Sequence, residues 1–475
     1  MGPDFERPPA PAVTGYTPGR SPAGTAAAAG EAQRFLRDRD IPGEWWTLFR
    51  SRSLKALIEE ALRNNSALKA AQAALEIARQ NTAAQRGFFF PSVDASFSAA
   101  RQKLPADVTG EIPNPSTFNI FTGQVSVSYT PDVFGANWRT VESLEALAES
   151  QRFQLEATYI TLTTNIVLAA VQEASLRGQI AATETIIKIA RDALELLRRQ
   201  RTLGQIPEAD VVAQEAALAQ IEQTLPPLQR QLQQQRHLIS ALIGRLPSQE
   251  PAQKFVLEGL RLPRDLPLTL PSTLVSQRPD IRAAEANMHS TSALIGVAVA
   301  NRLPNITLTA NDGSTAFDIS KLFSPHTGFW TVAGGVLQPV FRGGTLFHRE
   351  LAAHAAYDQA AAQYRSTVVT AFQNVADVLT ALQTDAVALE KAIAAERAAA
   401  RSLDITRRRL ELGDINYLAL LNAQQTYQQA LISLVQAKAN RYADTAALFQ
   451  ALGGGWWNKP NAPPDPPPTI TDFFQ

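Results

Sequence analysis

The chain has no cysteine, which excludes disulfide bonds and metal sites built on thiolates. It also has no excess of charge, because Lys+Arg and Asp+Glu both number 44, so it lacks the basic surface that nucleic-acid binding needs. No hydrophobic run is long enough for a transmembrane helix. A hydropathy profile alone would therefore class the protein as soluble, but such a profile misses transmembrane β-strands, whose signal is weak in each segment.

Recognisable catalytic motifs are absent as well. The 5 histidines show neither an i, i+4 pair nor a metal-ligand spacing with Asp or Glu. The phosphate-binding pattern Gly-x-x-x-x-Gly-Lys-Ser/Thr does not occur, so the chain is not expected to hydrolyse ATP. We therefore expect no enzymatic activity, no cofactor and no bound metal.

The first part of the chain shows three sequence patterns in turn. Residues 1–50 are rich in Pro, Gly and Ala, and we expect an extended N-terminal arm. Helices are expected at 51–64 and 66–86. Apolar and polar residues then alternate at about 91–101 and 118–131, which predicts two strands that each have one apolar face.

A very long helix is predicted after these strands. From Asn137 to about Arg201 there is no proline, and apolar residues recur in alternating steps of four and three. This spacing indicates a coiled-coil seam, interrupted at Glu173 and Thr183. Such a helix would be roughly 95–100 Å long, which no compact globule of this size requires.

A small turn ends the long helix. Gly204 stands where a left-handed helix cap is expected, and Pro207 stands near the start of the next helix. That helix should run to about Leu242, with a kink at Pro226 and Pro227.

The whole order then repeats, which indicates a tandem structural repeat. Asp280 is expected to cap a helix that runs to about Asn301. The remaining predicted parts are strands at about 303–313 and 328–341, a second long helix at about 344–411, a turn at about 411–416 and a last helix to about 452. We divide the chain into an arm (1–50), a first repeat (51–260, turn at about 202–207), a second repeat (261–455) and a Pro-rich tail (456–475).

The lengths of the predicted helices suggest how they pack. Each long helix has about 65 residues, and the two shorter helices of each half, with about 22 and about 37, sum to nearly the same length. Two short helices can therefore stack end to end beside each long one.

Four strands in one chain cannot close a barrel, and they would leave open edges that are hazardous in water and forbidden in lipid. Three chains would supply twelve strands and close a barrel around a conduit, whereas two would give eight strands and a filled interior. Two interpretations remain open at this point: a coiled-coil scaffold without a pore, and a small soluble sheet docked on the helices.

Several segments resemble a known family. They read "WWTLFRSRSLKALIEEALRNNSALKAAQAALEIARQ", "SQRPDIRAAEANMHSTSALIGVAVANRLPNITLTA", "QPVFRGG" and "LGGGWW". Together they resemble the outer-membrane factors of tripartite efflux systems, in the NodT-type lipoprotein branch with a TolC-like fold. The resemblance covers nearly the whole chain, and the Arg-Pro-Asp-Ile-Arg block with its following strand is its most specific part.

This resemblance implies a fold and a function. It implies a mainly α homotrimer with four strands per chain in a shared twelve-stranded β-barrel in the outer membrane, and a long α-helical tunnel in the periplasm. Such channels export drugs and other toxic compounds passively, working with a periplasmic adaptor and an inner-membrane pump that is commonly proton-driven. A duct for protein secretion would share the fold and stays open as an alternative.

The resemblance also implies a docking tip and a gate. The residues that match the adaptor-docking tip are Leu203, Gly204, Ile206, Leu412, Gly413 and Ile415. The family's gate pattern of Leu, Asp and Arg matches Leu418, Asn422 and Gln425, so the charged pair is missing here. A ring of Asp would bind cations and respond to protonation, whereas Asn would not. Asp414 is the remaining candidate for an acidic ring; a solvated turn residue is the alternative.

Members of this branch carry a lipidated cysteine shortly before a motif like "GPDFERP". In this chain Met1 stands just ahead of that motif. We expect the sequence to be a mature or shortened form, and the native full-length protein to be lipid-anchored, although a naturally unlipidated protein is the alternative.

Overall fold

The structure is a computed structural model that describes residues 1–18, 23–27, 32–37, 39–103, 117–412, 414–415 and 417–459. The chain divides into two compact units, each built from segments of both halves of the sequence. Unit 1 comprises Met1–Pro8, Ala74–Gln151 and Ala283–Tyr364, and unit 2 comprises Pro9–Ala73, Arg152–Arg282 and Arg365–Gln475.

Helices make up most of the described chain. The helices are α1 (Arg52–Asn64), α2 (Ser66–Arg86), α3 (Ala136–Thr202), α4 (Glu208–Glu222), α5 (Leu225–Leu242), α6 (Pro271–Gln277), α7 (Pro279–Ala300), α8 (Thr345–Glu411) and α9 (Tyr417–Ala451). The strands are β1 (Arg34–Arg37), β2 (Ser92–Lys103), β3 (Thr117–Tyr129), β4 (Asp265–Leu268), β5 (Asn305–Ala316) and β6 (Gly328–Leu337). Among the described residues, none of the helices combines the length and the hydropathy needed to cross a membrane.

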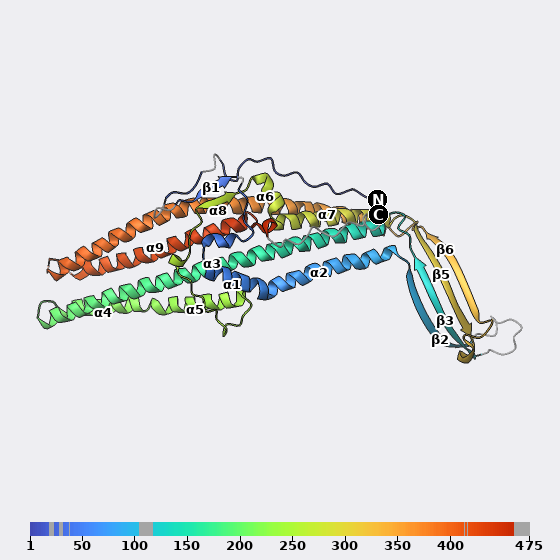
Figure 1. Cartoon of the computed structure of the whole chain (residues 1–475), viewed down its shortest axis with the longest axis horizontal. Helices are drawn as coiled ribbons and strands as arrows, with labels where there is room; N and C mark the ends of the chain where they lie inside the picture. Colours follow the sequence, from blue (N-terminus) through green and yellow to red (C-terminus); the bar gives the residue numbers. More distant parts are fainter. Residues whose placement is uncertain are drawn as a thin grey trace. The chain divides into compact units, whose positions relative to one another are not determined.

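Unit 1 contains an antiparallel sheet with the strand order β2-β3-β5-β6 (Figure 1). Its register aligns Val93 with Val127, Val127 with Ala310 and Ala310 with Val332. Side chains alternate between the two faces of a strand, so these four apolar residues share one face. The neighbouring row of Asp94, Ser126, Asn311 and Thr331 shares the other. The sheet therefore has one apolar and one polar face.

The first residues of the chain lie against α3 and α7 in unit 1. The backbones of Gly2 and Gly296 approach so closely that a Cβ built on Gly2 would lie 2.5 Å from the Gly296 Cα. Arg139 donates to the Met1 carbonyl at 3.0 Å and pairs with Asp4 at 2.6 Å. Residues 1–8 therefore form an extended segment that packs at a defined position against α3 and α7.

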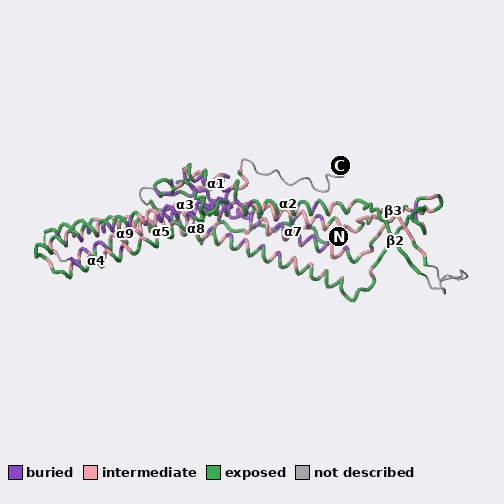
Figure 2. Tube along the Cα trace, turned by 90° about the horizontal axis from the view of Figure 1, so that it is seen from below, coloured by how far each residue is buried: buried purple, intermediate pink, exposed green. Residues whose placement is uncertain are grey.

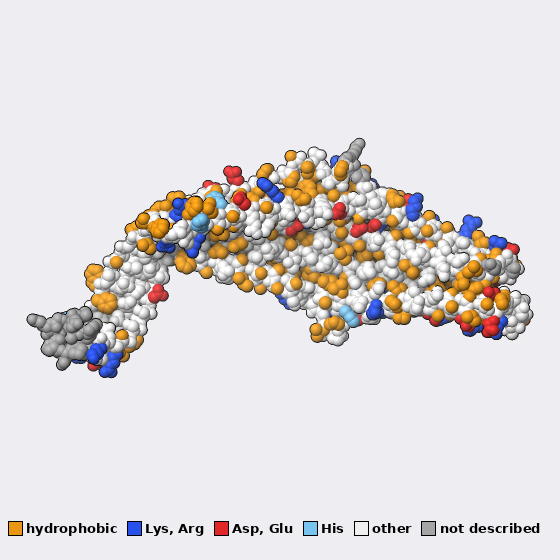
Figure 3. All heavy atoms as spheres, turned by 180° about the vertical axis from the view of Figure 1, so that it is seen from behind, with side chains coloured by type: hydrophobic (Ala, Val, Ile, Leu, Met, Phe, Trp, Pro, Cys, Tyr) orange, Lys and Arg blue, Asp and Glu red, His pale blue; other side chains and the backbone are white. Residues whose placement is uncertain are grey.

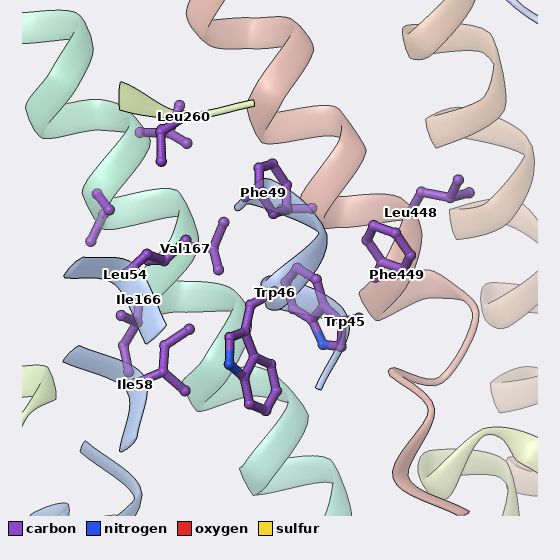
Figure 4. Packing of buried hydrophobic residues seen from close by; sticks show 14 of the residues in the cluster. Trp45, Trp46, Phe49, Leu54, Ile58, Ile166, Val167, Leu260, Leu448 and Phe449 are labelled. Carbon is purple, nitrogen blue, oxygen red and sulfur yellow. The ribbon is translucent and has the colours of Figure 1, made fainter. Parts of the chain in front are cut away.

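The core of unit 2 corrects the expectation that residues 1–50 are all an extended arm. Trp45–Phe49 forms a 3-10 helix, and Trp45, Trp46 and Phe49 are buried (Figure 4). The ring of Trp45 stacks on Phe449 of α9 with 5.1 Å between centroids. Buried residues gather around α1 and α3 (Figure 2). In the single chain β2 and β6 are largely exposed, whereas most residues of β3 and β5 are half-buried.

A parallel pair of short strands also ties the N-terminal segment to the second half. Phe35 of β1 pairs with Leu266 of β4, and both side chains are buried. Four-residue strands carry too little alternation to be recognised from the sequence. The arm is therefore fixed both by this ladder and by the aromatic residues that follow it.

The end of α5 meets the start of α2 at Asn65. The Asn65 side chain donates to the Leu242 carbonyl at 2.8 Å and accepts from the backbone N–H groups of Ala67 and Leu68. One buried amide thus satisfies one carbonyl at a helix C-terminus and two N–H groups at a helix N-terminus. Gly244 makes the close approach possible, since a Cβ there would lie 2.7 Å from the Asn64 oxygen.

Arg278 forms the equivalent joint in the second half. Its guanidinium donates to the carbonyl of Ala451, the last residue of α9, at 2.8 Å. It also binds the Asp280 carboxylate with two hydrogen bonds. The expectation that Asp280 caps α7 is wrong, because α7 begins at Pro279 and Asp280 lies inside its first turn. The end-to-end stacking of shorter helices is present at both joints.

Three interruptions in the predicted helices also have physical explanations. The prolines at 226 and 227 do not kink one helix but stand in the first turn of α5, where a missing N–H costs little. Glu173 lies fully buried in the α3 seam because Arg236 and Arg177 bind it at 3.0 and 2.7 Å. The Thr183 hydroxyl donates to the Gln179 carbonyl.

A pair of carboxyl groups lies between α8 and α9 in unit 2. Burial raises the pKa of Asp385 to about 7, a hydrogen bond to Asp444 and the charge of Asp444 add to this rise, and Arg441 opposes it. The protonated form of Asp385 is thus favoured in the folded chain. At pH values above the pKa of this aspartate in the unfolded chain, Asp385 is ionised when the chain is unfolded but still protonated when it is folded. The free energy of unfolding therefore falls as the pH rises toward 7.

We predict that Asp385→Asn stabilises the protein at about pH 8 but changes little at about pH 4, because Asn mimics the protonated acid. Guanidinium unfolding midpoints at both pH values measure this. Asp377→Asn, an exposed aspartate on the same helix, is the control. Equal pH dependence in the wild type and in Asp385→Asn would contradict the assignment.

Candidate docking and gating site

The first of the two predicted turns joins α3 to α4. Gly204 has φ +70°, a left-handed conformation that residues with a Cβ rarely adopt. Its N–H donates to the Arg201 carbonyl at 2.8 Å, and the Gln205 N–H donates to the Gln200 carbonyl at 2.9 Å. These two bonds form a Schellman cap that closes the last turn of α3. Pro207 then precedes α4 as its N-cap.

The second turn joins α8 to α9 and repeats one of these bonds. The Asp414 N–H donates to the Arg409 carbonyl at 2.9 Å, as the Gln205 N–H does to the Gln200 carbonyl. The two donors occupy the same position after Leu-Gly in the two halves of the sequence. Gly413, predicted as part of the docking tip, lies outside the described residues.

Within Leu-Gly-x-Ile the leucine and the isoleucine have different environments. Leu203 is 71% exposed and Leu412 is 82% exposed. Ile206 and Ile415 are half-buried and pack against an apolar cluster below the turns. The buried members of this cluster come from four helices: Leu194, Leu197, Val211, Leu403, Leu410, Tyr417, Leu420 and Ala423. The isoleucines therefore fix the turns, and the leucines present apolar surface.

A buried hydrogen-bond chain connects the two hairpins. The Tyr417 hydroxyl of α9 donates to the Gln214 side-chain carbonyl of α4, and the Gln214 amide donates to the Ala190 carbonyl of α3 at 2.7 Å. Gln214 is fully buried. Burial, with the charge of Asp210, raises the pKa of Tyr417, so its hydroxyl stays a donor at any physiological pH. This contact could not be predicted from the sequence, because neither residue belongs to a motif.

The hairpins differ in their ion pairs. Three arginines of α3 pair with three glutamates of α4: Arg191 with Glu222, Arg198 with Glu215 and Arg201 with Glu208. In the second hairpin residues 417–437 carry no charge at all. Charged side chains of both signs are seen over the ends of the hairpins (Figure 3). Exposed pairs each contribute only about 0.2–1 kcal/mol, so the apolar cluster dominates the stability of the tip.

The gate candidates lie along one stripe of α9. Leu418, Asn422 and Gln425 are spaced i, i+4 and i+7, which places them on one helix face, and all three are exposed. Leu418 is 60% exposed. Asp414 is also exposed, but Arg409 pairs with its carboxylate at 2.8 Å. Across the described part of the chain, no three His, Asp or Glu residues gather as metal ligands.

We predict that Ile206→Ala weakens the first turn by about 1–2 kcal/mol, because it removes half-buried apolar surface. Leu203→Ala should change the stability of the turn by less than about 0.5 kcal/mol. Hydrogen-exchange protection of the amides in residues 199–206 measures both effects. Equal loss of hydrogen-exchange protection in the two variants would contradict the claim that the isoleucine, and not the leucine, fixes the turn.

Comparison with known proteins identifies the family. A family model described as outer membrane efflux protein matches residues 57–245 and 270–454. The toluene efflux pump outer membrane protein TtgF of Pseudomonas putida is 30% identical over 97% of this chain and 95% of its own. The outer membrane protein OprJ of Pseudomonas aeruginosa is 29% identical over 96% of this chain and 93% of its own.

Solved structures show the same fold. The outer-membrane channel OprN superposes with a TM-score of 0.86 at 25% identity, covering 96% of this chain and 99% of its own. VceC of Vibrio cholerae superposes with a TM-score of 0.81 at 25% identity, covering 88% and 100%. These likenesses confirm the predicted TolC-like fold. The chain therefore belongs to the outer membrane efflux protein family.

Proposed function

We propose that this protein is the passive outer-membrane exit channel of a tripartite efflux pump for drugs or other toxic compounds. The observation that carries the proposal is an amphipathic four-stranded sheet, in a chain whose long helices end in two turns with exposed leucines. The efflux functions in the names of its relatives support small toxic compounds over secreted proteins as cargo. Its likeness to channel structures supports a pore over a scaffold.

The sheet supports a homotrimer. In the described chain β2 and β6 each have one neighbour, so each leaves an edge of unpaired N–H and C=O groups. Such edges cannot face lipid, and pairing β6 of one copy with β2 of the next removes them. Three copies give a twelve-stranded barrel with an open lumen, whereas two would give a filled one. The apolar face would contact outer-membrane lipid and the polar face would line the lumen.

The two turns are the proposed docking rim for a periplasmic adaptor. Leu203 and Leu412 offer exposed apolar side chains, supported from below by Ile206 and Ile415. A Cβ built at Gly204 would meet nothing within 4 Å in this chain. The glycine is therefore required by its left-handed backbone, and the open space above it is available to a partner. We assign Gly413 the same role from its equivalent place in the sequence.

The gate is proposed to be formed by the exposed stripe of α9. Leu418, Asn422 and Gln425 of three copies would constrict the lumen with apolar and neutral polar groups. Asp414 contributes little net charge there, because Arg409 pairs with it. We therefore propose a gate whose closure depends weakly on pH and cations. The inner-membrane transporter, commonly proton-driven in this family, would supply the energy, since the channel itself is passive.

We also propose that the full-length protein is lipid-anchored and that residues 51–260 and 261–455 are two structural repeats. The Met1 nitrogen lies beside Gly135, in the short link between β3 and α3. A lipid attached just ahead of Met1 would thus start from the boundary between strands and helices. The matching backbone hydrogen bonds from the Gln205 and Asp414 N–H groups support the repeat.

We predict that Leu203→Glu combined with Leu412→Glu abolishes efflux but leaves the trimer intact, because both side chains are exposed in the single chain. Drug susceptibility and dye export in cells that depend on this protein measure the effect. The control is Leu246→Glu, at another exposed leucine outside the turns. Undiminished drug resistance in cells with the double variant would contradict the docking proposal.

The barrel proposal has its own test. The chain has no cysteine, so a single spin label can be placed at Val332→Cys or at its neighbour Thr331→Cys, which face opposite sides of β6. In lipid bilayers we expect the label at 332 to be more accessible to oxygen and the label at 331 to water-soluble nickel chelate. Equal access of the chelate at both positions would rule out a lipid-facing sheet.

A further inference from the structure

A cavity of about 530 Å³ lies in unit 2, and none of its lining residues belongs to the two turns. Its walls are the end of the Trp45–Phe49 helix with the segment before it, residues 260–267, and Tyr442 of α9. The backbone holds these walls together: the Arg261 N–H donates to the Phe49 carbonyl at 3.0 Å, and the Tyr442 hydroxyl donates to the Leu260 carbonyl at 3.0 Å. The cavity is within the volume range of small-molecule sites.

Cationic side chains dominate the polar lining of this cavity. The charged residues around it are Arg39, Arg50, Arg261, Arg264, Asp40 and Asp265. The four arginines outnumber the two acids, and each acid has partners, one of which is an arginine of the same lining. Asp265 pairs with Arg39 at 3.6 Å, and the Asp40 oxygens accept from the side chains of Trp457 and Asn458. Within the described chain, no carboxylate lies within ion-pair distance of Arg50 or Arg261. The cavity is therefore net positive.

Arg50 has an unusual backbone. Its φ of 52° and ψ of 33° place it in the left-handed region. Among the described non-glycine residues only His326 also has positive φ. This conformation is strained for a residue with a Cβ, and glycine would avoid the strain. The Arg50 N–H donates to the Thr47 carbonyl at 3.0 Å, which holds the strained turn. Strained backbone of this kind persists only where the surrounding structure imposes it, and it clusters at ligand-binding sites.

Apolar side chains complete the lining. Leu48, Leu260, Leu262 and Tyr442 face the same space as the arginines. A free inorganic ion would leave this surface in contact with water, whereas an organic anion would cover it. A guanidinium binds carboxylate and phosphate groups through two parallel hydrogen bonds.

We propose that this cavity binds an anionic organic ligand. Its carboxylate or phosphate group lies against Arg50 and Arg261, and its sugar or apolar body lies against Leu48 and Tyr442. Cell-wall peptides carry such carboxylates, and phosphorylated sugars carry such phosphates. Both groups present anionic oxygens, which are what the arginines recognise. The site is separate from the turns and from the α9 stripe, so the proposal does not depend on the proposed efflux function.

Calorimetric titration of the purified full chain tests the site with two probes, muramyl dipeptide for the carboxylate and glucose 6-phosphate for the phosphate. We expect at least one probe to bind at low ionic strength. Arg50→Gln and Arg261→Gln should each weaken binding by about tenfold or more, because a charge-assisted bidentate contact is lost. Arg50→Lys should retain part of the affinity, since it keeps the charge but not the fork. Added salt should weaken binding.

Arg63→Gln, at an exposed arginine of α1, is the matched control and should bind like the wild type. Arg50→Gly relieves the backbone strain while removing the guanidinium, so it should fold stably and still lose binding. The probe that binds identifies the source of the anion. The proposal is overturned if neither probe binds at about 10 mM, a concentration that half-fills even a site with a dissociation constant of about 10 mM. It is equally overturned if the wild type and Arg50→Gly bind alike.

Discussion

The structure depends on covering the seams of two very long helices with shorter ones, and on joining the shorter ones without a gap. Every helix end leaves four N–H or C=O groups unpaired, so an end-to-end joint inside a core is costly unless a side chain satisfies it. Asn65 and Arg278 do this in the two halves with different chemistry, a neutral amide and a guanidinium paired to Asp280. Because these side chains satisfy backbone groups at the two joints, the shorter helices cover the seam of each long helix along its length. Strands can then precede each long helix, and a turn can follow it.

The predictable parts of this fold are those with strong local signals. Proline-free runs with a seam predicted α3 and α8, and alternation predicted the amphipathic sheet. Gly204 was predictable because a left-handed cap favours glycine. The proposed assembly of three copies rests on the four strands with their open edges and on the resemblance to a family.

What could not be predicted depends on long-range contacts. The aromatic residues at Trp45 and Phe49 looked like part of an arm because no periodicity surrounds them, yet their partner Phe449 lies at the other end of the sequence. Glu173 looked like a flaw in the seam because Arg236, which neutralises it, is on α5. The different roles of leucine and isoleucine in Leu-Gly-x-Ile emerge only from the cluster below the turns. The cationic cavity likewise combines residues from three distant segments.

The central claim is that copies of this chain enclose a conducting duct in the outer membrane. Single-channel recording of the purified oligomer in planar lipid bilayers tests it most directly. The account predicts insertion, discrete conductance steps and a larger conductance when Leu418→Ser widens the proposed gate. A protein that partitions away from detergent micelles and gives no conductance, with or without the Leu418→Ser change, would contradict it.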